Sequence, residues 1–244
     1  MERTETDKTI LLIFPCYNEE ENIAGLLSVA ANLKLPGYEI TCLPVNDFST
    51  DNTIAEIRKS APLYLNLANN LGIGGAVQAG LKFAKKHNFD FAIQVDGDGQ
   101  HPVDEIEKLV AGIEATACDI CIGSRYIEQQ GFQSTLPRRM GIGIINFLIK
   151  RVTGKTIHDS TSGFRIFNKK AINLFSDYYP DTYPEPESIV YGLMNGLHIS
   201  ETPVVMKERQ GGKSSIAGFN SGYYMVKVSL ALLFLKLNNL LKIN

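Results

Sequence analysis

Runs of apolar residues alternate with amphipathic helical patterns along the first half of the chain. Thr9–Phe14 is a continuous apolar run that ends at Pro15, which is typical of a strand buried on both faces of a parallel sheet. The alternation continues, predicting strands at Glu39–Val45, Leu63–Leu67, Phe91–Val95 and Asp119–Gly123 and helices near Thr53–Lys59, Gly75–His87 and Asp104–Glu114. The pattern therefore predicts an α/β fold with a mostly parallel, doubly wound sheet flanked by helices.

The second half of the chain is less regular. Short apolar stretches predict further strands at Phe164–Phe167 and Ile199–Val205, and Met140–Ile149 is an apolar stretch with basic residues at both ends. Tyr223–Leu241 has a Leu-rich helical pattern. Its longest uncharged run, Val228–Leu235, is far shorter than the roughly 18–20 apolar residues that a membrane-spanning helix needs. The sequence therefore predicts no transmembrane segment.

Composition excludes several classes of protein. The chain has 244 residues, 44% hydrophobic, and a formal net charge of -2, so global disorder is excluded. A pI near 6.1 argues against a nucleic-acid binder. Residues 1–121 hold 9 Lys/Arg and 18 Asp/Glu, whereas residues 122–244 hold 15 and 8, so the first half suits cations and the second suits phosphates or an anionic membrane. Met1–Lys8 lacks the apolar stretch of a secretory signal, which predicts a cytoplasmic protein.

The four cysteines lie in apolar segments, which predicts buried free thiols rather than disulfides. Cys118 and Cys121 have the spacing of a CxxC motif. In a strand over Asp119–Gly123, however, residues three apart point to opposite faces of the sheet. A metal or redox site formed by this pair is therefore the less favoured interpretation.

Two carboxylates follow the apolar strand at Phe91–Val95. Asp96 and Asp98 flank Gly97 in a turn at the carboxyl end of this strand, where both can bind one hard divalent cation. Gln100 would add a neutral oxygen ligand. A Mg²⁺ or Mn²⁺ ion there would neutralise a diphosphate and stabilise it as a leaving group. The alternative is an ordinary turn of Asp and Gly, but the position directly after a buried strand favours a site.

Polar residues also follow the first two strands. Tyr17 suits stacking on a base, and Glu19 or Asp47 would accept hydrogen bonds from a base or ribose. Taken singly, Asn18 and Ser49 are typical of helix caps and turns. Because the carboxyl ends of parallel strands share one edge of a sheet, the three polar strand ends together indicate a ligand crevice.

Two familiar nucleotide-binding motifs are incomplete. Gly72-Ile73-Gly74 is followed by Val77, where a dinucleotide fingerprint needs Gly or Ala. Gly212-Lys213-Ser214 ends like a P-loop, but Lys207 stands where the leading glycine belongs. The sequence therefore gives no support to an NAD-binding or a P-loop protein.

The basic second half supplies candidate phosphate ligands. Arg125 and Arg165 lie in short apolar contexts, where an unpaired charge would be costly. The other candidates are the pair Arg138-Arg139 and, in a glycine-containing loop suited to closing over a ligand, Arg209 and Lys213.

A series of ordered motifs from about Thr9 to Ser215 resembles the family-2 glycosyltransferases with the GT-A fold. The resemblance is to their polyprenyl-phosphate branch, which includes dolichyl-phosphate mannose synthase and bacterial undecaprenyl-phosphate sugar transferases. The motifs are PCYNEEEN, VNDFSTDNT, NLGIGGAVQAG, VDGDGQHP, IGSRY, the paired arginines, TSGFR and ERQGGKSS. Residues 1–215 are then expected to form the catalytic domain, and residues 216–244 an amphipathic, membrane-interfacial segment.

The resemblance also implies a role for each matching residue. Pro15, Tyr17, Glu19 and Asp47 would hold the nucleoside, and Asp96, Asp98 and Gln100 would bind Mg²⁺ or Mn²⁺. Arg209 and Lys213 would bind the donor diphosphate, and Arg125, Arg138 and Arg139 the acceptor phosphate. The chain departs from the usual VDDGST element, because Asn46 replaces an Asp and Phe48 replaces the Gly.

The implied reaction is inverting transfer of one sugar from a nucleotide-sugar to a polyprenyl phosphate at the cytoplasmic face of a membrane. A UDP-sugar is favoured by its frequency in the family. An ionised phosphate acceptor needs no general base. A chain without Trp lacks the QxxRW signature of processive polysaccharide synthases, which favours a single transfer. The expected partners are the membrane surface and either a small integral-membrane subunit or a second copy of the chain.

Two alternatives remain open at this stage. In one, the acceptor is a saccharide or protein hydroxyl, which needs a base such as His158 or Asp159, although both suit structural roles. In the other, the chain is a catalytically silent nucleotide-sugar-binding subunit, which the intact DGD turn and basic loops argue against.

Overall fold

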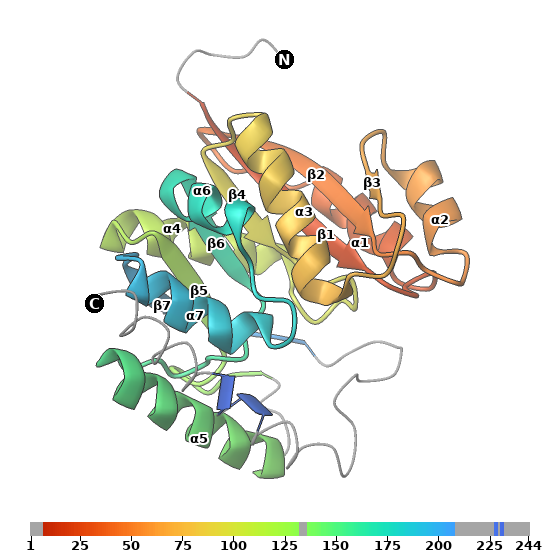
Figure 1. Cartoon of the computed structure of the whole chain (residues 1–244). Coiled ribbons are helices and arrows are strands. Elements are labelled where there is room, and N and C mark those ends of the chain that lie inside the picture. The colour runs from red at the N-terminus through yellow and green to blue at the C-terminus, as the bar shows by residue number, and fades with distance from the viewer. Residues whose placement is uncertain (1–6, 132–135, 208–226, 229, 232–244) are drawn as a thin grey trace.

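A seven-stranded sheet in the order β3-β2-β1-β4-β6-β5-β7 forms the centre of the protein (Figure 1). The computed structural model describes residues 7–131, 136–207, 227–228 and 230–231. The strands are β1 (Lys8–Cys16), β2 (Tyr38–Asn46), β3 (Leu65–Asn66), β4 (Phe91–Gln94), β5 (Ile120–Ser124), β6 (Arg165–Asn168) and β7 (Ile199–Pro203). Neighbouring strands are parallel except at β6, which runs antiparallel to β4 and β5. The mostly parallel sheet is confirmed.

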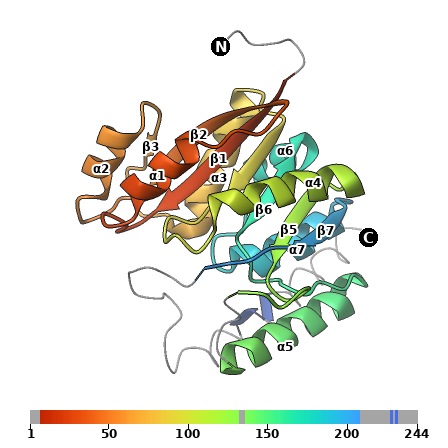
Figure 2. The same ribbon diagram turned by 180° about the vertical axis from the view of Figure 1, so that it is seen from behind.

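Helices cover both faces of this sheet, because alternate residues of the buried strands point to opposite sides. Leu11 and Ile13 of β1 pack with helices α3 (Gly72–Lys86), α5 (Leu136–Thr153), α6 (Lys169–Asp177) and α7 (Pro184–Met194). Ile10 and Leu12 pack with helices α1 (Ile23–Ala31), α2 (Thr53–Ser60) and α4 (Ile106–Thr116), the last preceded by the short 3-10 turn η1 (Val103–Glu105). Figure 2 shows α1 and α4 on the side away from α3 and α6, as expected for a doubly wound sheet.

The predicted elements of the first half are confirmed with small shifts of their ends. The strand expected at Leu63–Leu67 is reduced to two residues, Leu65–Asn66. In the second half, the strand expected at Phe164–Phe167 runs against its neighbours, and helices α6 and α7 were not predicted. The helical pattern at Tyr223–Leu241 lies almost entirely outside the described residues.

The four cysteines are free thiols, as predicted, and three of them are buried while Cys42 is half-buried. The expectation that Cys118 and Cys121 point to opposite faces of the sheet is wrong. β5 begins at Ile120, so Cys118 lies before the strand, and both sulfurs belong to the same apolar core between the sheet and α4. The strand alternation does not apply to a residue outside the strand.

Glu187 is a buried carboxylate with incomplete hydrogen bonding. It lies near the start of α7 with only 8% of its surface exposed, and its Oε1 atom has no hydrogen-bond partner in the described structure. Burial and the nearby Asp181 carboxylate raise the pKa of Glu187 to about 7, against the opposing effect of the Tyr183 backbone N–H. The ionised form of Glu187 therefore destabilises the folded state.

We expect Glu187→Gln to stabilise the protein above neutral pH. The folded state holds the Glu187 proton more tightly than the unfolded chain, so stability falls as the pH rises from about 4.5 to about 7. A pKa shift of this size corresponds to about 3 kcal/mol, and solvent screening reduces this value. We therefore expect the free energy of unfolding to rise by about 1–2 kcal/mol at pH 8, and by less towards pH 4.5. Urea unfolding at pH 5, 6.5 and 8 measures it. The exposed Glu128→Gln is the control, and an equal gain at every pH would contradict the assignment.

Candidate active site

The candidate site lies where β1, β2 and β4 end at their carboxyl termini. In the sheet register Cys16 pairs with Asn46, and Val95 donates from its backbone N–H to the carbonyl of Ile13 at 2.9 Å. The residues after these strands, which the sequence predicted as a crevice, therefore share one edge of the sheet. Ligands of open α/β sheets bind at this edge.

Gly97 brings the DGD turn directly against the end of β1. A Cβ atom at Gly97 would lie 3.2 Å from the carbonyl oxygen of Pro15 and 3.3 Å from Cγ of Glu19, which leaves little room for any side chain. Pro15, Glu19 and the two aspartates are therefore brought together as the sequence predicted. The close approach explains why a glycine separates the carboxylates.

The two aspartates of the turn are each oriented by a hydrogen bond. Asp96 Oδ1 accepts from Nε2 of Gln94 at 2.9 Å, and Asp98 Oδ1 accepts from the backbone N–H of Gln100 at 3.0 Å. Asp98 is 8% exposed, and the carboxylate of Asp96 is partly exposed. The turn thus presents carboxylate oxygens at the site edge in a fixed arrangement.

The donor set of this turn fits a hard divalent cation. Among the described residues no group of three His, Cys, Asp or Glu side chains is arranged to hold a metal. Mg²⁺ does not require such a group, because it is commonly held by one or two carboxylates together with substrate phosphates and water. Asp96, Asp98 and the amide of Gln100 are oxygen donors of that kind.

The predicted nucleoside side of the site contains two buried carboxylates. Asp47 is 3% exposed and its Oδ1 accepts from the backbone N–H of Leu71 at 2.7 Å, directly before α3. Burial raises the pKa of Asp47, although the N–H groups at the start of α3 act against this. Glu19 is 9% exposed, whereas Tyr17 is 48% exposed. Tyr17 is therefore the accessible group and Asp47 also anchors α3.

Phe48 has an unusual backbone conformation for an aromatic residue. Its φ of 59° lies in the left-handed region that favours glycine, and its side chain is 52% exposed. This is the position where the VDDGST element has Gly. The other replaced residue, Asn46, is buried and donates from Nδ2 to Oδ1 of Asn66 at 2.7 Å. The turn after β2 therefore forms without either of the usual residues.

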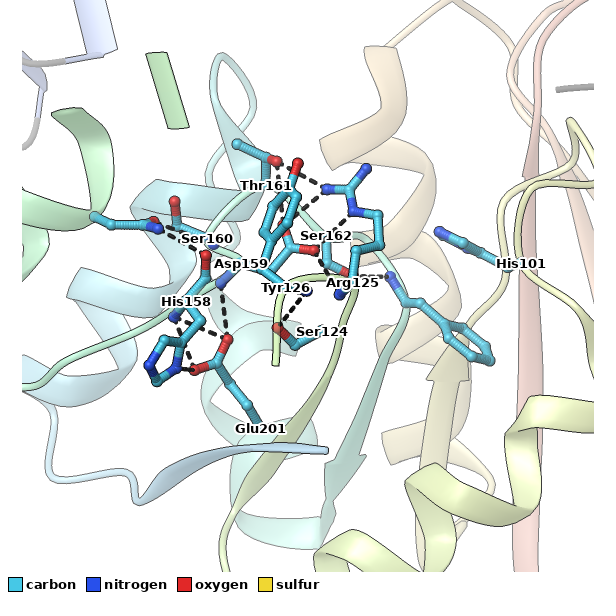
Figure 3. Close-up of polar contacts among 12 residues, drawn as sticks. His101, Ser124, Arg125, Tyr126, His158, Asp159, Ser160, Thr161, Ser162 and Glu201 are labelled. Carbon is cyan, nitrogen blue, oxygen red and sulfur yellow. Dashed lines mark hydrogen bonds and ion pairs between the residues drawn. The ribbon is translucent and has the colours of Figure 1, made fainter. Parts of the chain in front are cut away.

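Arg125 follows β5 and is paired with a buried carboxylate (Figure 3). Its Nε and Nη2 atoms donate to the two oxygens of Asp159 at 2.7 Å each, and Nη2 also donates to Oγ1 of Thr161 at 3.0 Å. Arg125 is 7% exposed and Asp159 is 0% exposed. Burial acts to lower the pKa of Arg125, but the pairing with Asp159 outweighs it, and the pKa of Arg125 is raised. The sequence did not predict Asp159 as this partner.

Glu201 of β7 holds the segment that carries Asp159. Its carboxylate accepts from the backbone N–H groups of His158 and Asp159 and lies 2.8 Å from Nδ1 of His158 (Figure 3). Asn146 of α5 donates to the carbonyl of His158 at 2.7 Å. His158 and Asp159 are therefore engaged in structural contacts, as the sequence favoured over a role as general base.

The paired arginines lie in the first turn of α5, and Arg139 approaches the same aromatic ring as Arg125. The guanidinium carbon of Arg139 lies 6.0 Å from the centre of the Tyr126 ring, and that of Arg125 lies 5.4 Å from it. Tyr126, which the sequence did not single out, therefore brings two of the predicted acceptor-phosphate ligands into one region. Arg138 precedes Arg139 in the same turn.

Arg165 does not serve as the phosphate ligand that the sequence suggested. It is 1% exposed and donates to the carbonyls of Ser162 and Ser160 and to Oγ of Ser188. Its guanidinium group is thus committed to the 160–162 segment and to helix α7, which accounts for the apolar context of this residue in the sequence.

The segment that leads to Arg209 and Lys213 starts beside the DGD turn. The backbone N–H of Lys207 donates to the carbonyl of Gln100 at 3.1 Å. Arg209 and Lys213 lie outside the described residues, and their roles stay predictions. The hydrogen bond nevertheless places the start of their segment at the candidate metal site.

Comparison with known proteins identifies the class to which this fold and site belong. The family model of glycosyl transferase family 2 matches residues 11–175. The chain is 29% identical over 218 residues to the UDP-N-acetylglucosamine–dolichyl-phosphate N-acetylglucosaminyltransferase of Methanococcus voltae, covering 81% of this chain and 85% of that protein. It is 28% identical over 234 residues to the polyprenol monophosphomannose synthase of Mycolicibacterium smegmatis, covering 92% and 86%.

A solved structure shares the fold at low sequence identity. Glucosyl-3-phosphoglycerate synthase from Mycobacterium tuberculosis, in complex with Mn²⁺, UDP-glucose and phosphoglyceric acid, superposes with a TM-score of 0.69 at 14% identity, covering 94% of this chain and 79% of that one. The expected GT-A fold is confirmed. The chain belongs to glycosyl transferase family 2, and the resemblance to its polyprenyl-phosphate branch is confirmed by the names of its relatives.

Proposed function

We propose that the protein transfers one sugar from a nucleotide-sugar, with a UDP-sugar favoured, to a polyprenyl phosphate, with inversion at the anomeric carbon. The observation that carries the proposal is the DGD turn. Gly97 fits it against Pro15 and Glu19, and Gln100 joins it to the segment that leads to Arg209. Carboxylates for a metal, the nucleoside side and the start of a basic loop therefore meet at one place.

Each group of residues has a distinct part in the proposed reaction. Tyr17, with Pro15, Glu19 and Asp47, binds the nucleoside, and Asp96, Asp98 and Gln100 hold Mg²⁺ or Mn²⁺. The ion, when bound, neutralises the diphosphate and so makes it a better leaving group. Arg209 and Lys213 complete the binding of the diphosphate. The Mycobacterium tuberculosis enzyme, which shares the fold, is in complex with Mn²⁺ and UDP-glucose, which supports a donor site that also holds a divalent ion.

Arg125, Arg138 and Arg139 bind the acceptor phosphate. The proximity of Arg125 and Arg139 to one aromatic ring supports this assignment. A phosphate monoester is largely ionised at neutral pH and attacks the anomeric carbon without a base. Asp159, one of the two alternative bases, is fully buried and paired with Arg125, which favours a phosphate over a hydroxyl acceptor. The named activities of the Methanococcus voltae and Mycolicibacterium smegmatis relatives support a polyprenyl phosphate.

A thermal-shift screen of nucleotide-sugars tests the donor half of the proposal. A ligand that binds only the folded state raises the melting temperature by mass action. We expect a UDP-sugar with Mn²⁺ to raise it, and the same nucleotide without metal to raise it less. A GDP-sugar that alone gives the shift would replace the uridine assignment, and no shift with any nucleotide-sugar would contradict donor binding.

We further propose that α5 binds the cytoplasmic face of the membrane, where the polyprenyl chain of the acceptor is embedded. The buried face of α5 consists of Ile142, Ile145 and Ile149. Its other face carries exposed apolar side chains at intervals of three or four residues: Leu136 (71% exposed), Met140 (67%), Ile144 (53%) and Phe147 (62%). An exposed apolar helix face of this kind marks a surface that binds a partner or a membrane.

The basic residues near the ends of α5 favour an anionic lipid surface as the partner of this face. Arg139, Lys150 and Arg151 are exposed near the two ends of α5. Basic side chains beside an apolar helix face attract anionic lipid headgroups at about 1 kcal/mol each. Within the described ranges, no helix combines the length and apolar character that crossing a bilayer requires. We therefore propose that the protein binds the membrane peripherally, assisted by a small integral-membrane subunit or a second copy of the chain.

We expect Phe147→Glu to weaken binding to anionic liposomes by about tenfold or more. The substitution removes an apolar side chain worth about 1.5–3 kcal/mol on burial and adds charge repulsion. Val29→Glu is the matched control, because Val29 is 59% exposed on α1, on the opposite side of the sheet. Co-sedimentation at low and high salt measures both. Equal binding of the two variants, or no binding of the wild type, would contradict the proposal.

A further inference from the structure

His101 is a buried residue whose two ring nitrogens both face Asp96. It is 4% exposed, and its Nδ1 accepts a hydrogen bond from the backbone N–H of Asp96 at 2.9 Å. Its Nε2 lies 3.6 Å from Oδ2 of Asp96. Because Nδ1 is an acceptor, a neutral ring carries its proton on Nε2, the nitrogen beside that carboxylate oxygen.

The ring of His101 is itself fixed from the other side. It stacks on Phe164, with ring centroids 4.9 Å apart and an angle of 24° between the planes. Phe164 is fully buried directly before β6. The preceding residue, Gly163, lies so close to Asp96 that a Cβ atom there would be 3.2 Å from Oδ2. The 163–164 segment therefore confines both the imidazole and the carboxylate.

The carboxylate of Asp96 is thus held by a hydrogen bond at Oδ1 and confined by the imidazole ring beside Oδ2. Gln94 donates to Oδ1 at 2.9 Å, and His101 approaches Oδ2 while also holding the backbone of Asp96. A metal-binding carboxylate whose rotation is restricted loses less freedom when the ion binds. Partners of this kind around metal ligands affect metal affinity by about 10–100-fold when they are removed.

We propose that His101 is a positioning residue of the metal site, which fixes the orientation of Asp96 for binding the divalent cation. The proposal rests on the metal-dependent function proposed above. His101 touches neither the substrate nor the reacting atoms. Its effect should therefore appear first in the affinity for the ion.

Titration with Mn²⁺ in the presence of UDP, followed by the EPR signal of free Mn²⁺, tests this inference apart from activity. His101→Phe keeps a ring that stacks on Phe164 but removes both nitrogens, and we expect it to weaken Mn²⁺ binding by about 10–100-fold. His101→Asn offers an oxygen near the position of Nδ1 but lacks the group at Nε2. Its loss of Mn²⁺ affinity should therefore be smaller than that of His101→Phe. His198→Phe, at an exposed histidine, is the matched control and should bind like the wild type.

Asp98→Asn separates failure of this inference from failure of the proposed function. Loss of Mn²⁺ binding in Asp98→Asn, with wild-type affinity in both His101 variants, would overturn the positioning role alone. Normal binding in Asp98→Asn would overturn the metal site itself. If His101→Phe does not fold, His101→Asn decides the question: weaker Mn²⁺ binding supports the role and wild-type affinity overturns it.

Discussion

Asp98→Asn will lose sugar transfer by about 100-fold or more while keeping the fold. The substitution removes a negative charge from the candidate metal site, and loss of one group that stabilises developing charge commonly costs this much. The amide oxygen of Asn can still accept the hydrogen bond that Oδ1 of Asp98 receives from Gln100 at 3.0 Å. The turn should therefore retain its shape, and the free energy of unfolding should change by less than about 1 kcal/mol.

The measurement is release of nucleoside diphosphate and formation of lipid-linked sugar, with Mn²⁺ or Mg²⁺ present. Asp104→Asn is the matched control, because Asp104 is an exposed aspartate shortly after the same turn. It should retain wild-type activity. Wild-type activity in Asp98→Asn, or equal losses in the two variants, would remove the DGD turn from the mechanism.

Asp159→Asn is expected to destabilise the protein by about 3–5 kcal/mol, the cost of leaving a buried charge without its partner. Arg125 donates to both oxygens of Asp159, and the pair is almost completely buried. After the substitution the guanidinium group faces a neutral amide in the same enclosed space. Sugar transfer should also fall, because Arg125 is a proposed ligand of the acceptor phosphate.

Urea unfolding of single and double variants separates the contribution of the Arg125–Asp159 pair to stability from other effects of the substitutions. Asp159→Asn combined with Arg125→Met removes both charges and should recover much of the lost stability. Glu56→Gln, which breaks the exposed pair with Lys59, is the control and should cost less than about 1 kcal/mol. A loss in Asp159→Asn no larger than in the control would show that the buried pair has little importance.

The first half of the fold was predictable because its strands are continuous apolar runs between recognisable helices. The direction of β6 was not, since a strand of four residues with two apolar side chains carries no information about which neighbours it will pair with. Helix α7 was missed because its buried residues surround the helix and include Pro184, Glu187 and Ser188. Such a helix shows no apolar stripe. Asn168, whose side chain caps α6, was the available signal for that helix.

The candidate site could be predicted as far as its residues follow one another in motifs. The motifs PCYNEE and DGD and the start of the last basic segment were predicted to meet at the carboxyl edge of the sheet. The structure places their described residues at that edge. The partners of these residues could not be predicted in the same way. Asp159 meets Arg125, and Phe164 meets the ring of His101, only because β5, β6 and β4 are neighbours in the folded sheet. The sequence placed these residues in separate motifs.

An assay that compares acceptors tests the central claim most directly. Purified protein with Mn²⁺ and the nucleotide-sugar selected by thermal shift is offered a polyprenyl phosphate and, separately, a panel of oligosaccharides. We predict that nucleoside diphosphate is released and sugar becomes attached to the lipid only with the polyprenyl phosphate, and that Asp98→Asn abolishes this. Transfer to a saccharide hydroxyl, or no transfer to any acceptor despite donor binding, would contradict the account.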